Sequence, residues 1–403
     1  MLILAAALAV AVAVIAALNV GPIQRSKSWE ATVTPLASII GSGFLICGPL
    51  LAREFGGAAA PAMGVLLLLA YGLGAVVRFN IRRLEPLLAD LPPRDPIAWT
   101  ARFTQAVLAA AYAVSVAYYL KLLAEFALRP FALGPDLQAL ASRGLVTALV
   151  GMFVVLALSG GLHRMERLAH MTVSLKLGVI AGMFVALALS WITAAAPPGL
   201  PPLKVSVQSL PMLLGLLITV QGFETSRYMG EAYGPEVRRR AMRHAQWISS
   251  AIYMVFLVLL TPFLGRAAQT EGVAGILDIM ALTAPLMGGV VMTGALASQL
   301  SAATADSIGS AGLASELSEK RLSLKMGFVA SAALTVAVVW LTDPFEVVAA
   351  ASRAFGAFYM LQCVLAVMAA RRTGAAGWPA QVGMAALGAA ALAAALAGAP
   401  AGG

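Results

Sequence analysis

The sequence has little charge and few of the residues that hold metals or carry out catalysis. Only 11% of its 403 residues are charged and three are histidines, whereas 61% are hydrophobic. A soluble protein of this length would need far more charge to cover its surface. The two cysteines, Cys47 and Cys363, lie in apolar runs and are expected to be small core residues. The composition therefore predicts a multi-pass protein of the cell (plasma or inner) membrane, embedded in the lipid bilayer, with no cofactor and no metal.

Catalytic motifs are also missing. The sequence contains no HExxH, no GxSxG and no DxxxD pair at a helix end, and its loops are too short for the output domain of a sensor. The net charge of +9 does not require nucleic acid, because basic residues also gather in the cytoplasmic loops of membrane proteins. We therefore predict a transporter that is not an enzyme, with a membrane sensor or a membrane enzyme as weaker alternatives.

Long apolar runs recur along the chain, as expected of membrane-spanning helices. With the 20–32 loop placed inside the cell, the inside loops contain 17 lysines and arginines and the outside loops and ends contain 5. This asymmetry predicts that both termini face outward. We expect about twelve spans, at 2–19, 33–54, 57–78, 97–128, 144–161, 170–193, 209–231, 244–265, 281–315, 326–342, 345–370 and 378–399.

Two of these spans contain breaks at matching positions. The span at 33–54 is interrupted at Gly41 and Gly43, and the span at 209–231 is interrupted around Gly222. Each begins a group of five spans, and an odd number of spans turns the second group upside down relative to the first. Matching broken helices in two inverted halves indicate a transporter site.

The expected domain organisation follows from this symmetry. The third span of each group, at 97–128 and 281–315, is unusually long, which predicts a strong tilt. The predicted parts are an extra N-terminal helix with its cytoplasmic loop (1–31), a first repeat (32–193), an outer connector (194–208), a second repeat (209–370) and a C-terminal helix with its tail (371–403).

The breaks themselves predict a binding site. Lipid cannot satisfy the N–H and C=O groups of an unwound stretch, whereas a substrate or an ion can. The N–H groups at the start of a half-helix attract a carboxylate, and free carbonyls attract a cation or an ammonium group. We expect a small zwitterion or an organic amine between the breaks. The candidate substrate-binding residues are Ile39, Ile40, Gly41, Ser42, Gly43, Thr219, Gln221, Gly222, Phe223 and Glu224.

The same residues resemble a known family. The segment 39–44, IIGSGF, looks like the helix-1 signature of amino acid–polyamine–organocation (APC) transporters, and residues 222–224, GFE, look like their helix-6 motif. The stretch 167–176, RLAHMTVSLK, resembles their helix 5, including its lysine. The resemblance covers about residues 32–370. It implies an all-α membrane protein with the LeuT-type 5+5 inverted repeat, here with one extra helix at each end. It also implies secondary active transport of a small amino acid or an organic amine by alternating access.

A second resemblance lies in the span at 281–315. Residues 300–307, LSAATADS, look like the Ser-Thr-x-Asp-Ser segment of sodium/solute symporters, but Ala303 stands where that pattern has its first serine. In APC relatives that work without sodium, the amine that matches Lys176 occupies the place of the ion. The favoured mechanism is therefore proton-coupled or sodium-independent, and the alternative is transport coupled to sodium or of an inorganic ion.

Charged groups at membrane depth are costly, and they are functional candidates for that reason. Burial favours the uncharged amine of Lys176, which suits a proton carrier. Glu224 either takes up protons or caps the broken helix. The candidate residues for coupling to a proton or a sodium ion are Lys176, Thr304, Asp306, Ser307, Ala37 and Leu300.

Overall fold

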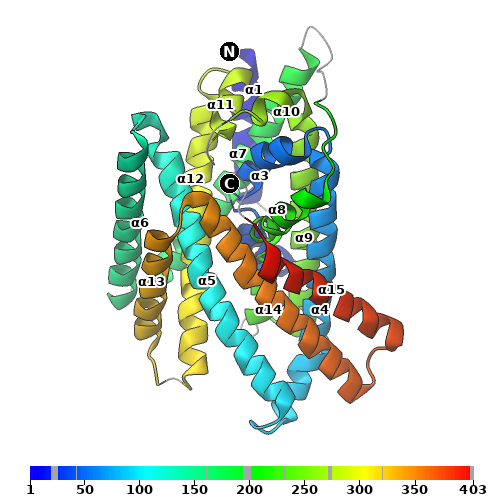
Figure 1. Cartoon of the computed structure of the whole chain (residues 1–403). Helices are drawn as coiled ribbons and strands as arrows, with labels where there is room; N and C mark the ends of the chain where they lie inside the picture. The colour runs from blue at the N-terminus through cyan, green and yellow to red at the C-terminus, as the bar shows by residue number, and fades with distance from the viewer. Residues whose placement is uncertain are drawn as a thin grey trace.

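The protein is a bundle of helices, shown in Figure 1 as a computed structural model. The structure describes residues 1–19, 26–41, 43–159, 162–193, 201–229, 233–270, 275–319 and 321–399, with the backbone alone for 162–171. Ser42 and residues 194–200 of the expected connector lie outside this set. The α-helices are α1 (Leu2–Asn19), α2 (Lys27–Ile39), α3 (Gly43–Phe55), α4 (Ala59–Asp90), α5 (Pro96–Leu128), α6 (Pro135–Leu158), α7 (Leu162–Ile192), α8 (Leu210–Leu214), α9 (Pro235–Leu260), α10 (Leu264–Ala267), α11 (Ile276–Thr283), α12 (Met287–Leu317), α13 (Leu324–Leu341), α14 (Pro344–Thr373) and α15 (Trp378–Ala397). The 3₁₀-helices are η1 (Arg129–Phe131), η2 (Val207–Ser209), η3 (Leu217–Val220), η4 (Phe223–Tyr228) and η5 (Thr261–Phe263).

The spans correspond to those predicted. Within the described ranges, nine helices are long and apolar enough to cross a bilayer, and α2 with α3 makes a tenth if the bent pair is one span. The remaining two predicted spans are α12, which has 31 residues but contains the polar stretch 298–310, and the interrupted segment 210–228. The chain is therefore an all-α polytopic membrane protein with about twelve spans, as the apolar runs predicted.

Several helices extend beyond the apolar runs that predicted them. α4 was expected to end at 78 but continues past Pro86 to Asp90, because most of the residues that follow are good helix formers and the chain first meets a proline pair at Pro92–Pro93. α6 and α9 begin about two and a half turns before the predicted starts, with polar residues that hydropathy does not detect. The run expected at 281–315 was wrong at its start, because Leu286 has a left-handed φ of +68° that separates α11 from α12.

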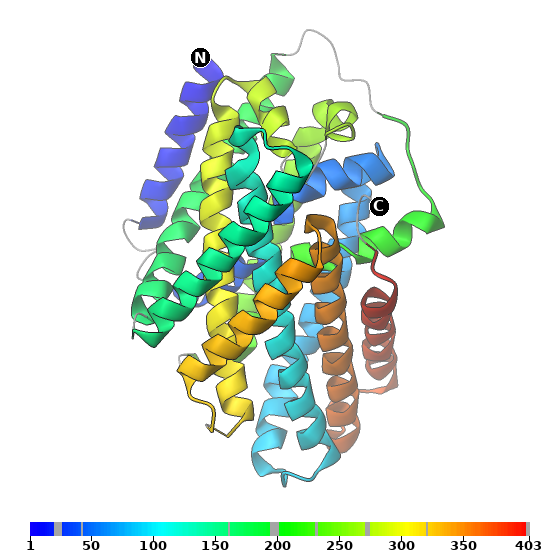
Figure 2. The ribbon, with the colours of Figure 1, turned by 60° about the vertical axis from the view of Figure 1, so that its left-hand side comes forward.

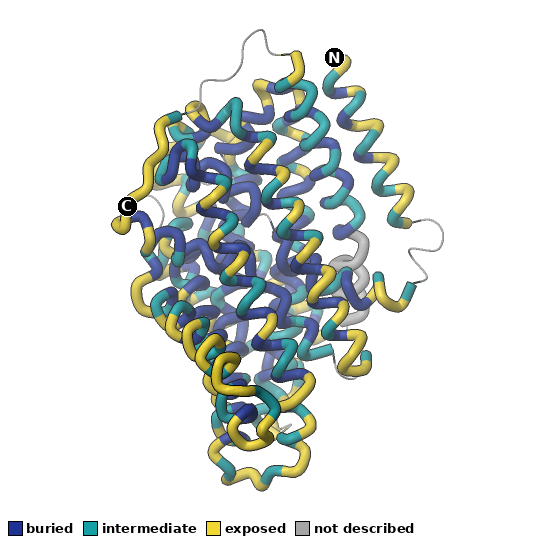
Figure 3. The backbone as a smooth tube through the Cα atoms, turned by 90° about the vertical axis from the view of Figure 1, so that its right-hand side faces the viewer, coloured by how far each residue is buried: buried dark blue, intermediate teal, exposed yellow. Residues whose placement is uncertain are grey.

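The long helices α5 and α12 pack against each other through the middle of the bundle (Figure 2). The two broken segments lie beside them, since α2 contacts η4, α3 contacts η3, and α12 contacts α2. α1 packs on the outside of α7, where Gly178 and Gly182 leave room for the backbone of Ala11 and Ala7. The tube in Figure 3 shows this layering, with buried backbone at the centre and exposed positions on the outer faces.

One end of the bundle has a group of basic residues, and we call it the basic end. The turns that join α4 to α5, α12 to α13 and α14 to α15 lie there, whereas the N-terminus of α1 lies at the opposite end (Figure 1). The basic end includes Arg82, Arg83, Arg94, Arg239, Arg240, Arg321, Lys325, Arg371 and Arg372.

Candidate substrate and ion-coupling site

The two predicted helix breaks are present and face each other. α2 ends at Ile39 and α3 begins at Gly43, with a bend of 43° between the two helices. The second break separates η3 from η4, with Gln221 extended and Gly222 at a left-handed φ of +114°. A Cβ atom on Gly222 would lie 2.7 Å from the backbone nitrogen of Ile39. Glycine is therefore required at 222, both for its backbone angle and because the two breaks approach so closely.

Glu224 lies at the start of η4 and is fully buried. Its Oε2 atom accepts hydrogen bonds from the backbone N–H of Gly222 (2.9 Å) and from the hydroxyl of Tyr359 (2.6 Å). This is the geometry of a cap on the broken helix, which was one of the two roles expected from the sequence. Its Oε1 atom has no hydrogen-bond partner among the described residues. Phe223 stacks on the ring of Tyr359, with the ring centroids 5.2 Å apart.

Tyrosines occupy the space that the glycines of the first break leave open. A Cβ atom on Gly41 would lie 2.8 Å from the ring of Tyr119, and one on Gly43 would lie 2.6 Å from the hydroxyl of Tyr118. The sequence led us to expect that this space admits the substrate to the backbone. In this conformation the aromatic rings fill it instead.

Tyrosine hydroxyls also satisfy the free carbonyls of the breaks. Tyr253 donates to the carbonyl of Thr219 and, at 3.4 Å, to that of Ile39, and so joins the two breaks. Tyr119 donates to the carbonyl of Ser38 at 3.4 Å, and Gln221 donates to the Tyr119 hydroxyl at 3.5 Å. The carbonyls expected to bind an amine are thus bonded within the protein, and a substrate would have to displace these hydroxyls.

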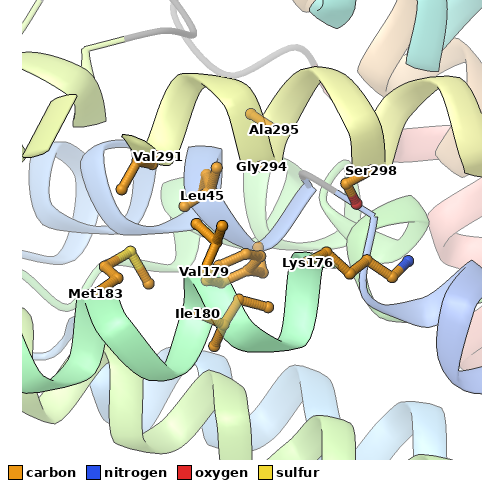
Figure 4. Close-up of a pocket in the computed structure, with 10 residues that line it drawn as sticks. Leu45, Lys176, Val179, Ile180, Met183, Val291, Gly294, Ala295 and Ser298 are labelled. Carbon is orange, nitrogen blue, oxygen red and sulfur yellow. The ribbon is translucent and has the colours of Figure 1, made fainter. Parts of the chain in front are cut away.

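Lys176 reaches from α7 to the end of α2. Its Nζ atom donates to the carbonyls of Ala37 (2.6 Å) and Ile40 (2.7 Å), and the Ser298 hydroxyl donates to the Ile40 carbonyl at 3.1 Å. Figure 4 shows this amine directed to the break, away from the apolar side chains beside it. Those side chains enclose a cavity of about 10 Å³, lined among others by Val179, Ile180, Met183, Val291 and Ala295.

The candidate residues of α12 do not join Lys176. The Thr304 hydroxyl donates to the carbonyl of Leu300 and the Ser307 hydroxyl to that of Ala303, each at 2.7 Å within the helix itself. The Oδ2 atom of Asp306 accepts a hydrogen bond from the Ser115 hydroxyl at 2.5 Å. Its Oδ1 atom has no partner among the described residues. The predicted ion ligands are therefore divided, with the Ala37 carbonyl on the lysine and the α12 hydroxyls satisfied within their own helix.

A cavity of about 470 Å³ adjoins this region. Its lining includes the exposed Glu30, the half-buried Tyr233 and the buried Tyr112, so it runs from the surface into the interior. Burial and the nearby Glu30 carboxylate raise the pKa of the Tyr233 phenol, which stays neutral and bonds to Glu30. The other lining residues are Val33, Thr34, Ala37, Val173, Thr225, Tyr228, Met229, Ser301, Ala302, Ile308, Gly309 and Leu313.

An ionic network holds η4 to its neighbours on the basic side of the break. Arg238 of α9 donates to both carboxylate oxygens of Glu85 on α4, at 3.0 and 2.6 Å, and to the carbonyl of Arg227 at 2.6 Å. The Arg227 side chain lies 3.8 Å from Glu85 and donates to Gln362 of α14. Both arginines are largely buried, so Glu85 is their shared counter-charge.

Sequence reasoning did not find the tyrosines that surround the breaks. Tyr112, Tyr119, Tyr253 and Tyr359 belong to three different helices and lie far from the breaks along the chain. An aromatic residue in an apolar run gives no local sign of which neighbour it contacts. A buried hydroxyl in a span does need a partner, and that requirement was the one available signal.

The comparisons agree with this architecture. A family model described as APC superfamily transporter matches residues 21–398. An uncharacterized protein of Aquifex aeolicus (strain VF5) is 36% identical over 352 residues, which make up 85% of this chain and 84% of that protein. Among solved structures, the substrate-bound outward-open state of a Na⁺-coupled sialic acid symporter matches with a TM-score of 0.54 and 14% identity, over 98% of this chain and 94% of that one.

These findings define a secondary transporter with the LeuT-type inverted-repeat fold, and not an enzyme. The chain belongs to the APC superfamily of transporters, because the family model covers nearly all of it. The resemblance seen in the helix-1 and helix-6 motifs is thereby confirmed.

Proposed function

We propose that this protein transports a small organic amine by alternating access, with the Lys176 amine in the place where other carriers of this fold hold a sodium ion. The observation that supports this proposal is the pair of bonds from Lys176 to the carbonyls of Ala37 and Ile40. A sodium ion needs several such oxygen atoms at once, and a tethered amine already uses two of them.

The choice of an amine rests on the buried groups that lack partners. Glu224 Oε1, Asp306 Oδ1 and Gln221 Oε1 are all acceptors that no donor reaches within the described residues. Buried acceptors without partners are costly, and a ligand with several N–H groups satisfies them. An ammonium group also suits the electron-rich faces of the surrounding tyrosines. Amino acids remain candidates through their amino group, but the packing of Gly43 against Tyr118 gives their carboxylate little room in this conformation.

The cavity supports access from the basic end, which the distribution of lysine and arginine assigns to the cytoplasm. It reaches Tyr112 beside the breaks, whereas the tyrosines pack around Gly41 and Gly43 on the other side. We infer an inward-facing state. Movement of α2–α3, α4, 210–228 and α9 against the remaining helices would open the opposite side.

Sodium coupling is the second candidate. The resemblance of residues 300–307 in α12 to sodium/solute symporters favours it, and the Na⁺-coupled symporter among the structural matches has the same fold. Ala303 in place of a hydroxyl residue and the hydrogen bonds of Thr304 within α12 count against it.

The test is transport by purified protein in proteoliposomes, with a pool of radiolabelled amines and a pool of zwitterionic amino acids. Proton and sodium gradients are imposed separately. We expect amine uptake that responds to the proton gradient and is indifferent to sodium. Uptake that requires sodium would move the coupling site to Thr304 and its neighbours. No uptake of either pool under either gradient would contradict the proposed substrate class. Uptake that stays the same after both gradients are collapsed would contradict coupling.

A further inference from the structure

A second group of charged residues lies on the outer surface between α4 and α9, away from the cavity. Arg78 of α4 contacts Gln246 of α9, and Arg243 and Arg239 lie about one and two turns before Gln246 on that helix, so the three positive charges repel one another. The guanidinium of Arg78 donates to Gln246, which in turn donates to the carbonyl of Ala70 at 2.8 Å. This neutral amide fixes the position of Arg78 but does not balance its charge.

The local negative charge is insufficient. Among the described residues, the carboxylate that pairs with this group is that of Glu236, which is 2.7 Å from Arg239 and is shared with Arg240 at 3.1 Å. The Nε atom of Arg239 is buried and has no partner within the described part of the chain. The arginines therefore keep an excess of positive charge and at least one free donor, which is the chemistry that binds a phosphate group.

An aromatic pair follows the arginines along the exposed face of α4 and α9. The Arg78 guanidinium lies over the ring of Tyr71, 4.9 Å from its centroid, and Tyr71 meets Trp247 edge to face at 5.9 Å. The Trp247 side chain is 63% exposed, although tryptophan usually loses most of its surface. Arginine at the membrane surface with tryptophan one turn deeper is the arrangement of a membrane–water interface.

The surface beyond the aromatic pair is apolar. Leu68 and Val65 precede Tyr71 on α4, and Val255 and Val258 follow Trp247 on α9, all at helical spacing and all exposed. A free phosphate or a nucleotide would gain no binding energy from an apolar surface. A lipid would, because its acyl chains would lie along these residues while its headgroup meets the arginines.

We propose that the exposed face formed by α4 and α9 binds an anionic phospholipid of the leaflet at the basic end, with its phosphate on Arg78, Arg239 and Arg243. The acyl chains lie over Tyr71 and Trp247. Both helices belong to the group proposed to move, so a bound lipid would tie them to each other at the surface.

The experiment is a lipid titration of the purified protein in detergent, followed by native mass spectrometry, with phosphatidylglycerol and phosphatidylcholine as probes. We expect phosphatidylglycerol to bind more tightly to the wild type. The double variant Arg78→Gln/Arg243→Gln should bind it about 25-fold more weakly, because each arginine near the surface contributes roughly a fivefold factor. The matched control is Arg371→Gln/Arg372→Gln, which removes the same charge at the same end of the bundle and should retain tight binding.

Two further measurements cover the other outcomes. Trp247→Ala leaves the charges in place and should weaken phosphatidylglycerol binding severalfold, which keeps the proposal testable if the arginine variant does not fold. Inorganic phosphate should not compete with the lipid. Equal affinity for the two lipids, equal losses in the two arginine variants, an unchanged affinity in Trp247→Ala, or competition by phosphate would each overturn the proposal.

Discussion

Replacing Lys176 tests the coupling site most directly. Lys176→Ala removes the amine and leaves space next to α2, whereas Lys176→Met removes the amine but fills most of that space. Both variants leave the carbonyls of Ala37 and Ile40 without the donor that the structure gives them. The Ala37 carbonyl is then unpaired, whereas the Ile40 carbonyl keeps the Ser298 hydroxyl as a donor. The loss therefore costs about 1–3 kcal/mol, less what is regained because no amine is buried. We therefore expect both variants to melt several degrees below the wild type in sodium-free buffer.

Sodium should then distinguish the two variants. In Lys176→Ala the lone pairs that remain on the two carbonyls and on the Ser298 hydroxyl oxygen can bind a hard cation, since oxygen atoms are the ligands such ions prefer. A sodium site with a Kd of about 10 mM would stabilise the variant by about 1.4 kcal/mol in about 100 mM sodium. The wild type and Lys176→Met should show no such gain, because an amine or a methyl group occupies the site.

The assay is thermal unfolding in sodium chloride and in choline chloride at equal ionic strength, combined with proton-driven uptake in proteoliposomes. Lys325→Ala is the control, because this lysine lies at the basic end and bonds only to the carbonyl of Leu158 among the described residues. The reasoning is refuted if sodium stabilises the wild type as much as Lys176→Ala. It is also refuted if Lys176→Ala keeps full proton-driven uptake.

Three more substitutions test the packing around the breaks. Gly222→Ala should lower the melting temperature strongly, because the φ of +114° at this position is left-handed. Gly312→Ala is the control and should leave the melting temperature unchanged or slightly higher, because a Cβ atom at 312 meets nothing within 4 Å. Equal effects of the two substitutions would contradict the steric reason. Gly43→Ala should reduce uptake, because the added methyl group would collide with the Tyr118 hydroxyl. Adding Tyr118→Phe removes that hydroxyl and should restore part of the uptake. A double variant as slow as Gly43→Ala alone would show that the hydroxyl is not the obstacle. Glu85→Ala should destabilise the protein by about 3–5 kcal/mol in thermal or denaturant unfolding, because two buried arginines lose their counter-charge, and a loss below about 1 kcal/mol would contradict that role.

The features that could be predicted from the sequence are local ones. Apolar length predicts the spans, and the glycines at 41, 43 and 222 predict the breaks, because each signal is contained within one segment. Helix ends were less predictable: α4, α6 and α9 continue into polar residues, where hydropathy gives no information but helix propensity remains high.

The partners within the site depend on contacts between segments that are distant in sequence. Thr304 and Ser307 were predicted from a motif to turn their hydroxyls towards an ion. Within the helix each hydroxyl instead reaches the carbonyl four residues earlier, which is the usual alternative for serine and threonine. Asp306 similarly takes Ser115 of α5 as its donor, a pairing that only the crossing of α5 and α12 makes possible.

The break in α2 and the lysine of α7 are best understood as one device. The end of a helix presents unpaired carbonyls with partial negative charge, so the end of α2 attracts any cation small enough to enter. A free sodium ion arrives at its bulk concentration, whereas the Lys176 amine is held beside the carbonyls at a much higher effective concentration. An ion of millimolar affinity cannot displace it. Sodium dependence is therefore expected only after the lysine is removed or moved away. For that reason the Lys176→Ala variant, rather than the wild type, is the form in which the sodium site of this fold should become observable.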